Sequence, residues 1–548
     1  MKGCLVGFVV MLGLLCSGCA LGAGDSKCDA LKNLTLDQTL ISSVDADRGG
    51  YSLSWKTAFI GVPWLKLPAS CRVDGVIQPT SDSHIGFTVW MPARDWNGRF
   101  LGLGNGGFGG SIEKIGLSFA LQHGYAVAAT DTGHVASDLD GSWALGHPEK
   151  LLDYGYRAIH ETAQKAKTLI AAYYGRPPSY SYFSGASNGG RQALMEAQRY
   201  PEDYDGILVG CPPADGATAM ASSIWIQKQL NRSPAAYIPK RKLPAIAAAT
   251  VAACDALDGV KDGVIDDPRH CNFHPESLRC AGKETNACLT APQIESLRAI
   301  YSGDGGVFDG HRRRGYEPGG ELGSFGGWAK YLLGSGPGKG VLYRYSLEFP
   351  RFLIYKDPQW TLDHFDVEKF HADAEHALGQ IYSTDDPDLT AFKSRGGKLI
   401  LFHGWSDPAI PPRLTVDYYE RMRATMGTDS VDGFVRLYMV PGLQHGVGGP
   451  GANVFGQLAP GSGDARHNIS AALFDWVEKG VAPGAIIASR YDGDLKPLLA
   501  PDRATLIRTR PLCPYPEFAR WTGRGSSDDA ETFSCVAPPL ETVRAMQP

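Results

Sequence analysis

The segment GASNGG, residues 185–190, holds a serine in a spacing that suits nucleophilic chemistry. Ser187 stands between Gly185 and Gly189, after the strand-like run SYSYF and before the helix-like run RQALMEAQRY. A sharp strand-to-helix turn of this pattern exposes a serine hydroxyl, which can then attack an ester carbonyl. The alternative interpretation is a glycine-rich turn whose serine only caps the following helix.

A serine nucleophile needs a base, and the base needs an acid that orients it. Asp407 lies in HGWSDPAIPP directly after the strand-like KLILF, and His445 lies in VPGLQHGVGG directly after FVRLYMV. We expect His445 to deprotonate Ser187 and Asp407 to fix the imidazole tautomer and stabilise the imidazolium. Alone, Asp407 would be a turn residue and His445 a loop histidine. Their order after the serine, each following a strand, favours a catalytic triad.

Ester hydrolysis also needs hydrogen-bond donors for the negative charge that develops on the carbonyl oxygen. The backbone N–H of Asn188 is one candidate donor. The run GLGNGGFGG offers a second at Gly106 or Gly107, where the absence of a side chain allows the backbone to approach a substrate closely. The same run lacks the Lys-Ser/Thr of a P-loop and the spacing of a dinucleotide loop, so it does not indicate phosphate binding.

The elements that must position these groups follow an α/β pattern. From about residue 85, strand-like runs (HIGFTVWMP, GRFLGLG, GYAVAATD) give way to an amphipathic helical stretch that begins at Pro148. Residues 214–392 break this rhythm with many glycine, proline and aromatic residues, and the alternation resumes with GGKLILFHG. We therefore predict an α/β-hydrolase catalytic domain from residues 24–213 and 393–548, with an inserted lid domain at 214–392.

The composition excludes some classes of function. The 548 residues are 43% hydrophobic and 20% charged, which is typical of a soluble globular protein with a large core. The net charge of -5 and the pI near 6.3 offer no broad basic surface for nucleic acid. We therefore expect a small-molecule substrate and no nucleic-acid partner.

Residues 1–23 have the character of a signal peptide, because Lys2 precedes a short apolar stretch that runs into small residues. Two processing routes stay open. Ordinary signal peptidase could cleave after the small residues, or LCSGC could act as a lipobox that leaves Cys19 as a lipid anchor, with Cys16 in the usual aliphatic position. We expect a periplasmic or secreted protein, and no later segment has the length and apolar character of a membrane span.

Setting aside Cys4, Cys16 and Cys19 leaves nine of the twelve cysteines, and an exported chain can oxidise them. Neighbours along the chain suggest four disulfides: Cys28 with Cys71, Cys254 with Cys271, Cys280 with Cys288, and Cys513 with Cys535. Cys211 is then a free thiol. Zinc binding is the alternative, but the sequence has no CxxC pair and the cysteines are widely spread.

The segment CDALDGVKDGVIDDPRHC offers a different chemistry. Asp255, Asp258, Asp262 and Asp266 recur among glycines, so that carboxylate and carbonyl oxygens could converge on a hard cation such as calcium. The spacing is not that of an EF-hand, and a solvated acidic turn is the alternative. A bridge between the flanking cysteines would tie the loop closed.

Taken in order, seven motifs make the chain resemble the tannase and feruloyl esterase family, which also includes enzymes that cleave mono-hydroxyethyl terephthalate. They are WNGRFLGLGNGGFGG, ATDTGH, GHPEKLLDYGYRAIH, GASNGGRQALMEAQRYPEDYDGI, CDALDGVKDGVIDD, GWSDPAIPP and MVPGLQHG. The resemblance covers nearly all of the mature chain. It implies an α/β-hydrolase domain with a lid inserted after the strand that ends near Cys211, the triad Ser187, Asp407 and His445, and the four disulfides suggested above.

The resemblance also implies a structural calcium ion in the lid. Its ligands would be the side chains of Asp255, Asp258 and Asp262 and the backbone carbonyls of Val260 and Val264, with Asp266 behind them. It further implies an aromatic-lined pocket for a phenolic or aromatic acyl group. Candidates for that pocket are Ile410, as its floor, and the aromatic residues Trp328, Tyr331, Phe349 and Tyr355.

One departure from the family pattern concerns the triad. The family commonly has a cysteine directly before the nucleophile and another directly after the histidine, joined as a disulfide, whereas this chain has Ala186 and Gly446. We predict a working triad with a looser link between Ser187 and His445. The protein should therefore lose activity in milder denaturant than a cysteine-bridged relative does, and equal resistance would contradict this prediction.

The sequence thus predicts an exported, feruloyl esterase-like serine carboxylesterase that hydrolyses esters of aromatic acids through an acyl-enzyme. Within the same chemistry, a tannase acting on gallate esters or a mono-hydroxyethyl terephthalate-type hydrolase remains open. A non-catalytic binding protein on a hydrolase scaffold is an alternative of another class, against which the intact triad argues. Calcium-dependent glycan binding is a third, but the acidic loop lies between expected structural bridges. The acyl group and the oligomeric state stay undetermined.

Overall fold

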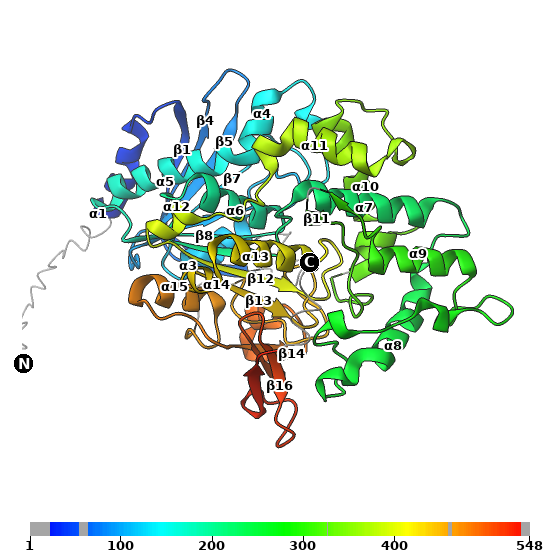
Figure 1. Cartoon of the computed structure of the whole chain (residues 1–548). Helices are drawn as coiled ribbons and strands as arrows, with labels where there is room; N and C mark the ends of the chain where they lie inside the picture. Colours follow the sequence, from blue (N-terminus) through cyan, green and yellow to red (C-terminus); the bar gives the residue numbers. More distant parts are fainter. Residues whose placement is uncertain (1–21, 54–63, 309, 326, 459–462, 539–548) are drawn as a thin grey trace, which may run out of the picture.

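The computed structural model describes residues 22–53, 64–308, 310–325, 327–458 and 463–538 (Figure 1). Cys4, Cys16, Cys19 and nearly all of the predicted signal peptide lie outside these residues. In the described ranges, no helix combines the length and the apolar character that crossing a membrane requires.

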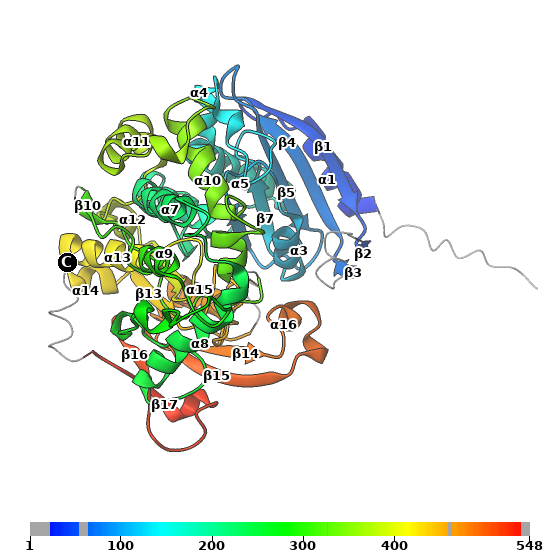
Figure 2. The same ribbon diagram turned by 90° about the vertical axis from the view of Figure 1, so that its right-hand side faces the viewer.

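A nine-stranded sheet forms the centre of the molecule (Figures 1 and 2). Its strands lie in the order β1 (Thr39–Asp47), β4 (Ser70–Ile77), β5 (Ile85–Pro92), β7 (Ala126–Thr130), β6 (Arg99–Leu103), β8 (Tyr180–Ala186), β9 (Gly206–Gly210), β12 (Lys398–Gly404) and β13 (Val435–Val440). The strands from β1 to β7 pair antiparallel, and those from β7 to β13 pair parallel. The three strands β8, β12 and β13 therefore present the ends that precede Ser187, Asp407 and His445 at the same edge of the parallel block.

Helices cover both faces of the parallel block, which explains why the runs AVAAT of β7 and GILVG of β9 are almost entirely apolar and fully buried. One face packs against α5 (Ala158–Tyr174), α6 (Asn188–Arg199) and α13 (Arg413–Met426). The other packs against α3 (Lys114–Gln122) and α15 (Ile469–Lys479). The stretch after Pro148 is helical as expected, with α4 (Pro148–Leu152) joined to α5 through the wider turn η3 (Asp153–Arg157).

The segment between β9 and β12 contributes no described strand to the main sheet and forms a mostly helical body beside it (Figure 1). Its elements are α7 (Gly216–Asn231), α8 (Leu243–Cys254), α9 (Ala291–Ser302), the short hairpin β10 (Val307–Phe308) and β11 (His311–Arg312), α10 (Val341–Glu348) and α11 (Val367–Tyr382). Two apolar clusters hold it together, one under α7, α10 and α11 and one under α7, α8 and α9. This body occupies the position predicted for the lid, whose boundaries remain a prediction.

The remaining elements are peripheral. They are α1 (Gly22–Ala30), the pair β2 (Gly50–Leu53) and β3 (Trp64–Leu67), α12 (Thr390–Ser394), α14 (Thr428–Asp432), α16 (Lys496–Leu499), and two C-terminal strand pairs, β14 (Ile486–Tyr491) with β15 (Leu506–Leu512) and β16 (Phe518–Trp521) with β17 (Phe533–Val536).

The four suggested disulfides are present: Cys28–Cys71, Cys254–Cys271, Cys280–Cys288 and Cys513–Cys535. Cys211 is a buried free thiol.

Candidate active site

Ser187 lies on the turn between β8 and α6 with backbone angles φ 62° and ψ -128°. This conformation is uncommon for a residue with a side chain, and strain of this kind is typical of a nucleophile elbow. The turn is held because the Ser187 N–H donates to the Gly210 carbonyl at 3.0 Å and the Arg191 N–H donates to the Ser187 carbonyl at 3.1 Å.

The glycines around Ser187 are required by close backbone contacts. A Cβ at Gly185 would lie 2.3 Å from the Gly189 carbonyl oxygen, and a Cβ at Gly190 would lie 2.4 Å from the Gly210 carbonyl oxygen. Both distances are shorter than any real Cβ contact, so no larger residue fits without moving the backbone. A Cβ at Gly189 would lie 3.2 Å from the nearest atom, so the strictest requirement for glycine in the GASNGG turn falls on Gly185 and Gly190.

The structure brings His445 and Asp407 together. Nδ1 of His445 lies 2.8 Å from Oδ2 of Asp407, which suits an Nδ1–H that donates to the carboxylate and leaves Nε2 as the base. Ser187 and His445 line the same cavity. Within the described part of the chain, the Ser187 hydroxyl has no hydrogen-bond partner, and catalytic hydrogen bonds are often long when no substrate is bound.

Asp407 is buried and accepts more hydrogen bonds than the sequence indicated. The backbone N–H groups of Ala409 and Ile410 donate to its Oδ1 at 2.7 and 3.1 Å, and Nε2 of His403 lies 3.1 Å from its Oδ2. Burial alone would raise the pKa of Asp407, but the charge of His445 and the hydrogen bonds from both histidines outweigh it and hold the pKa well below its usual range.

The pKa of His445 moves in the opposite direction. Burial disfavours the charged imidazolium, but the negative charge of Asp407 outweighs burial and raises the pKa of His445 well above its ordinary value. An acid that stays ionised next to a histidine with a raised proton affinity is the electrostatic arrangement that a general base requires.

The predicted oxyanion donors border the same cavity, which Asn188, Gly106 and Gly107 line together with Ser187. Gly107 has φ 57°, and a Cβ there would lie 2.3 Å from both the Asp138 carbonyl and the Tyr345 hydroxyl. Only glycine fits this position. A Cβ at Gly106 would meet no atom within 4 Å, so that glycine leaves open space.

Two side chains that the sequence analysis did not single out join the glycine loop to the serine turn. The oxygen of the buried Tyr154 hydroxyl lies 3.0 Å from the Gly107 carbonyl and 3.2 Å from Oδ1 of Asn188, so its single hydrogen can be shared between the two acceptors. From α6, Gln192 accepts from the Asn105 N–H at 3.1 Å and donates to Oδ1 of Asn105 at 2.8 Å. Tyr154 lies within a motif that supports the family resemblance, but no local pattern indicates which residues it contacts.

The cavity beside the triad has a volume of about 330 Å³ and a mostly apolar lining. Ile410 lines it, as predicted for the pocket floor, and so do Tyr331 and Phe349. The ring of Tyr331 meets the imidazole of His445 edge-on, with centroids 5.8 Å apart. Other aromatic lining residues are Phe108, Tyr154, Tyr345 and Tyr382.

The structure does not place Trp328 at this cavity. Its indole is 1% exposed and belongs to the apolar cluster under α8 and α9, where it packs against Tyr301. The largest apolar side chain is thus in the core, whereas Tyr331, which has a polar hydroxyl, borders the cavity. Tyr355 also lies away from it, stacked on Trp360.

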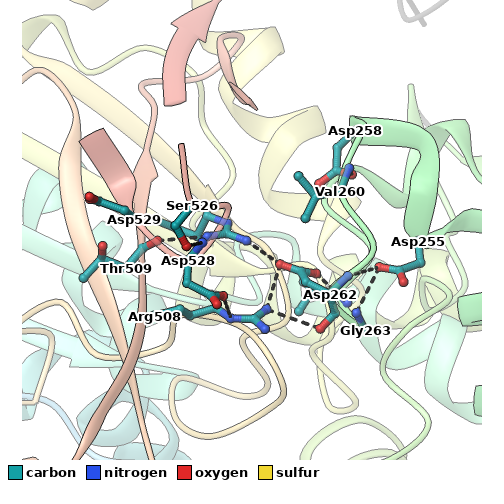
Figure 3. Close-up of polar contacts among 12 residues, drawn as sticks. Asp255, Asp258, Val260, Asp262, Gly263, Arg508, Thr509, Ser526, Asp528 and Asp529 are labelled. Carbon is teal, nitrogen blue, oxygen red and sulfur yellow. Dashed lines mark hydrogen bonds and ion pairs between the residues drawn. The ribbon is translucent and has the colours of Figure 1, made fainter. Parts of the chain in front are cut away.

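The acidic loop lies between α8 and the C-terminal strand β15. Oδ1 of Asp255 accepts from the N–H groups of Asp262 and Gly263, while Oδ1 of Asp258 and Asp262 accept from Val260 and Val264. Figure 3 shows the Asp262 side chain, on the side of the loop that faces Arg508. Oδ2 of Asp262 pairs with Arg508 at 2.7 Å and with Arg510 at 2.5 Å.

The loop fits calcium in the chemistry of its donors, which are carboxylate and carbonyl oxygens. Burial, with the charges of Asp262 and Asp255, raises the pKa of Asp258 to about 6. Burial, with the charges of Asp258 and Asp262, raises the pKa of Asp266 well above its ordinary value. A cation would relieve this concentration of acids. The carboxylates of Asp255, Asp258 and Asp262 do not all approach within 4.8 Å of one another, because Asp262 faces the two arginines.

Comparison with known proteins identifies the family. The model of the family described as tannase and feruloyl esterase matches residues 71–536. This chain belongs to the tannase and feruloyl esterase family. It is a carboxylic ester hydrolase with an α/β-hydrolase fold, and the interpretation as a non-catalytic binding protein is therefore wrong.

Three similar proteins illustrate the match. An uncharacterized esterase of Xanthomonas campestris is 42% identical over 94% of this chain and 92% of its own. The mono(2-hydroxyethyl) terephthalate hydrolase of Piscinibacter sakaiensis is 33% identical over 86% of each chain. The crystal structure of feruloyl esterase B from Aspergillus oryzae superposes with a TM-score of 0.82 at 26% identity, covering 94% of this chain and all of that one.

Proposed function

We propose that this protein is a serine carboxylesterase that hydrolyses esters of aromatic acids through an acyl-enzyme. One observation supports this proposal above all: the strained Ser187 turn and His445, which pairs with the buried Asp407, line the same mostly apolar cavity, together with several aromatic side chains. The names of the related proteins, a feruloyl esterase and a mono(2-hydroxyethyl) terephthalate hydrolase, agree with an aromatic acyl group.

In the proposed reaction, Nε2 of His445 takes the proton of Ser187 as Oγ attacks the ester carbonyl. In this proposal the backbone N–H of Asn188 and that of Gly107 or Gly106 stabilise the oxyanion. The imidazolium, stabilised by Asp407, then gives its proton to the leaving alcohol. A water molecule, deprotonated by His445, then attacks the acyl-enzyme carbonyl; His445 returns the proton to Ser187 and the acid is released. We expect Ser187→Ala to lower kcat by about 10⁴- to 10⁶-fold, since triad members act as a unit.

The acyl group is feruloyl-like in our first proposal, with gallate and terephthalate monoester as alternatives. A planar phenolic acyl group suits a cavity bordered by Tyr331, Phe349 and Ile410. The alternatives differ in their ring substituents and in the distance from ring to ester carbonyl, since ferulate has a propenoyl linker there and gallate and terephthalate have none. The hydroxyls of the cavity tyrosines can respond to the substituents, and the depth of the cavity to the linker.

The test is release of free acid from methyl ferulate, methyl gallate and mono-hydroxyethyl terephthalate by the purified protein beside Ser187→Ala. Hydrolysis of one ester that the substitution abolishes would support the triad and identify the acyl group. If the folded, calcium-loaded protein cleaved none of the three, the substrate assignment would be wrong. If Ser187→Ala remained active, the nucleophile assignment would be wrong.

We also propose that a structural calcium ion binds the loop through Asp255, Asp258, Asp262 and the carbonyls of Val260 and Val264. The concentration of buried acids supports this proposal. When bound, the ion would neutralise this charge and rigidify the loop. Export to the periplasm or the cell exterior is a further proposal, supported by four disulfides that require an oxidising compartment.

A further inference from the structure

Cys211 is a buried thiol beside the candidate triad. It is 1% exposed and directly follows β9. Its Sγ, a ring nitrogen of His445 and a carboxylate oxygen of Asp407 all lie within 4.8 Å of one another. The thiol is therefore in the immediate surroundings of the general base, although it does not line the cavity that would receive a substrate.

The backbone holds this sulfur in place firmly. The Cys211 N–H donates to the Phe402 carbonyl of β12 at 2.8 Å, and the preceding carbonyl, of Gly210, accepts from Ser187 at 3.0 Å. Cys211 has φ 35°, a backbone conformation that residues with a side chain rarely adopt and that is typical of functional sites. The same dipeptide thus supports the backbone of the nucleophile and directs a side chain toward the base.

The sulfur occupies space between the serine turn and the histidine loop. A Cβ at Gly446 would lie 3.8 Å from Sγ of Cys211 and 3.8 Å from Cβ of Ala186. Gly446 has no side chain and Ala186 has only a methyl group. Sγ of Cys211 is therefore the large polarizable atom that packs against the backbone next to His445.

The histidine loop is rich in glycine and is held mainly by its own backbone, in which the Gln444 N–H donates to the Gly448 carbonyl at 3.0 Å and the Gly446 N–H to the Gln444 carbonyl at 2.7 Å. Gly442, Gly446, Gly448 and Gly449 all have positive φ. Asp407 fixes only the Nδ1 side of the imidazole, and the Tyr331 ring meets it edge-on. A contact with the Cys211 thiol, whose Sγ lies within 4.8 Å of a ring nitrogen of His445, adds a constraint on the position of the ring relative to Ser187.

We propose that Cys211 is a positioning residue for His445: its thiol packs between the serine turn and the histidine loop and holds the imidazole where it can take the Ser187 proton. This proposal rests on the proposed triad. The physical reason is that proton transfer is sensitive to small displacements of the base, and a shift of about 1 Å can lower a rate by about 100-fold.

The test compares Cys211→Ala and Cys211→Ser with the wild-type protein on whichever aromatic ester it hydrolyses. We expect Cys211→Ala to lower kcat about 10-fold while KM changes less than about 2-fold, because substrate binding does not involve the thiol. Cys211→Ser keeps a small polar atom in the same place and should recover part of kcat. Thr162→Ala, which removes a buried polar atom on α5, is the matched control and should keep the wild-type kcat.

Thermal unfolding of each variant separates positioning from stability. A Cys211→Ala protein that is folded at the assay temperature and has the wild-type kcat would overturn the proposal, as would equal losses in kcat for Cys211→Ala and Thr162→Ala. If Cys211→Ala does not fold, Cys211→Ser decides: a lower kcat at unchanged KM supports the proposal and a wild-type kcat overturns it. Activity remaining in Ser187→Ala would instead show that the proposed triad is wrong.

Discussion

The residues of the candidate site form two groups that meet at the cavity. Ser187 and Asn188 belong to the serine turn, and Gly107 belongs to the glycine loop. The hydroxyl of Tyr154 contacts both groups, because it lies within hydrogen-bond distance of the Gly107 carbonyl and of the Asn188 side chain. The distance between the two candidate oxyanion donors therefore depends on a side chain that is not itself a member of the triad.

We predict that Tyr154→Phe lowers kcat by about 10-fold and leaves KM within about 2-fold. The substitution removes the hydroxyl that fixes the oxyanion donors, and those donors act chiefly in the transition state. Steady-state kinetics on an aromatic ester would check this. Tyr174→Phe is the matched control, since its hydroxyl bonds to the Pro92 carbonyl away from the cavity. Equal kinetics for both variants would contradict the prediction.

The raised pKa of His445 predicts a pH dependence. Only the neutral imidazole can accept the Ser187 proton, so kcat/KM should fall as pH decreases through the pKa of His445. The acidic limb should therefore lie above pH 6.5, the ordinary value for histidine. Asp407→Asn removes the charge that raises this pKa, and it should lower kcat by about 10⁴-fold and move the limb to lower pH. A limb below pH 6.5 in the wild-type protein would contradict this.

At the scale of elements, one carboxylate of the acidic loop has two prospective partners: the proposed calcium ion and the arginines of the strand β15. Asp262 is a proposed calcium ligand, yet its Oδ2 pairs with Arg508 and Arg510. Arg508 also lies 3.2 Å from Asp528. Ion pairs thus join the C-terminal strand β15 to the loop. A cation bound by Asp262 would weaken these ion pairs.

We predict that calcium raises the melting temperature more at pH 7 than at pH 5. The raised pKa of Asp258, about 6, means that its carboxyl stabilises the calcium-free fold at low pH and that this contribution is lost as pH rises through 6. Above pH 6 the carboxylate is charged and can bind the ion. Thermal unfolding with calcium or with chelator would measure this.

Asp258→Asn serves as the variant control for the calcium prediction and should reduce the calcium-dependent increase at pH 7. Magnesium should substitute poorly, because it demands a more regular octahedral arrangement. An equal increase in melting temperature at both pH values, or none at either, would contradict the prediction.

At the scale of the whole molecule, one histidine connects the two places where the chain crosses between the catalytic domain and the predicted lid. Nδ1 of His311 lies 2.7 Å from Asp215, where the chain leaves the sheet, and Nε2 lies 3.3 Å from Asp385, where it returns. The two crossings also bond directly, since the N–H and the hydroxyl of Thr384 both donate to the Ala214 carbonyl.

We predict that His311→Gln lowers the melting temperature by about 2–4 °C at pH 6 and hardly at all at pH 9. The hydrogen bond with Asp215 raises the pKa of His311, so its stabilising contribution is full below the ordinary histidine pKa and is lost as pH rises through the raised value. His467→Gln is the control, because His467 and Asp464 form an exposed pair. A pH-independent effect of His311→Gln would argue against a charged bridge.

The sequence by itself determined the α/β-hydrolase fold, the family and the four disulfides, because strand periodicity, motif order and cysteine spacing are local properties of the chain. It also named Ser187, Asp407 and His445; in the structure Ser187 and His445 line one cavity and the buried Asp407 lies behind His445, although their roles remain predictions. Only the tertiary structure decided which distant side chains meet: Cys211 beside His445, Tyr154 across the oxyanion loop, Tyr331 instead of Trp328 at the cavity, and the arginines of β15 on Asp262. These contacts join segments far apart in sequence, and they depend on packing, which no local pattern specifies.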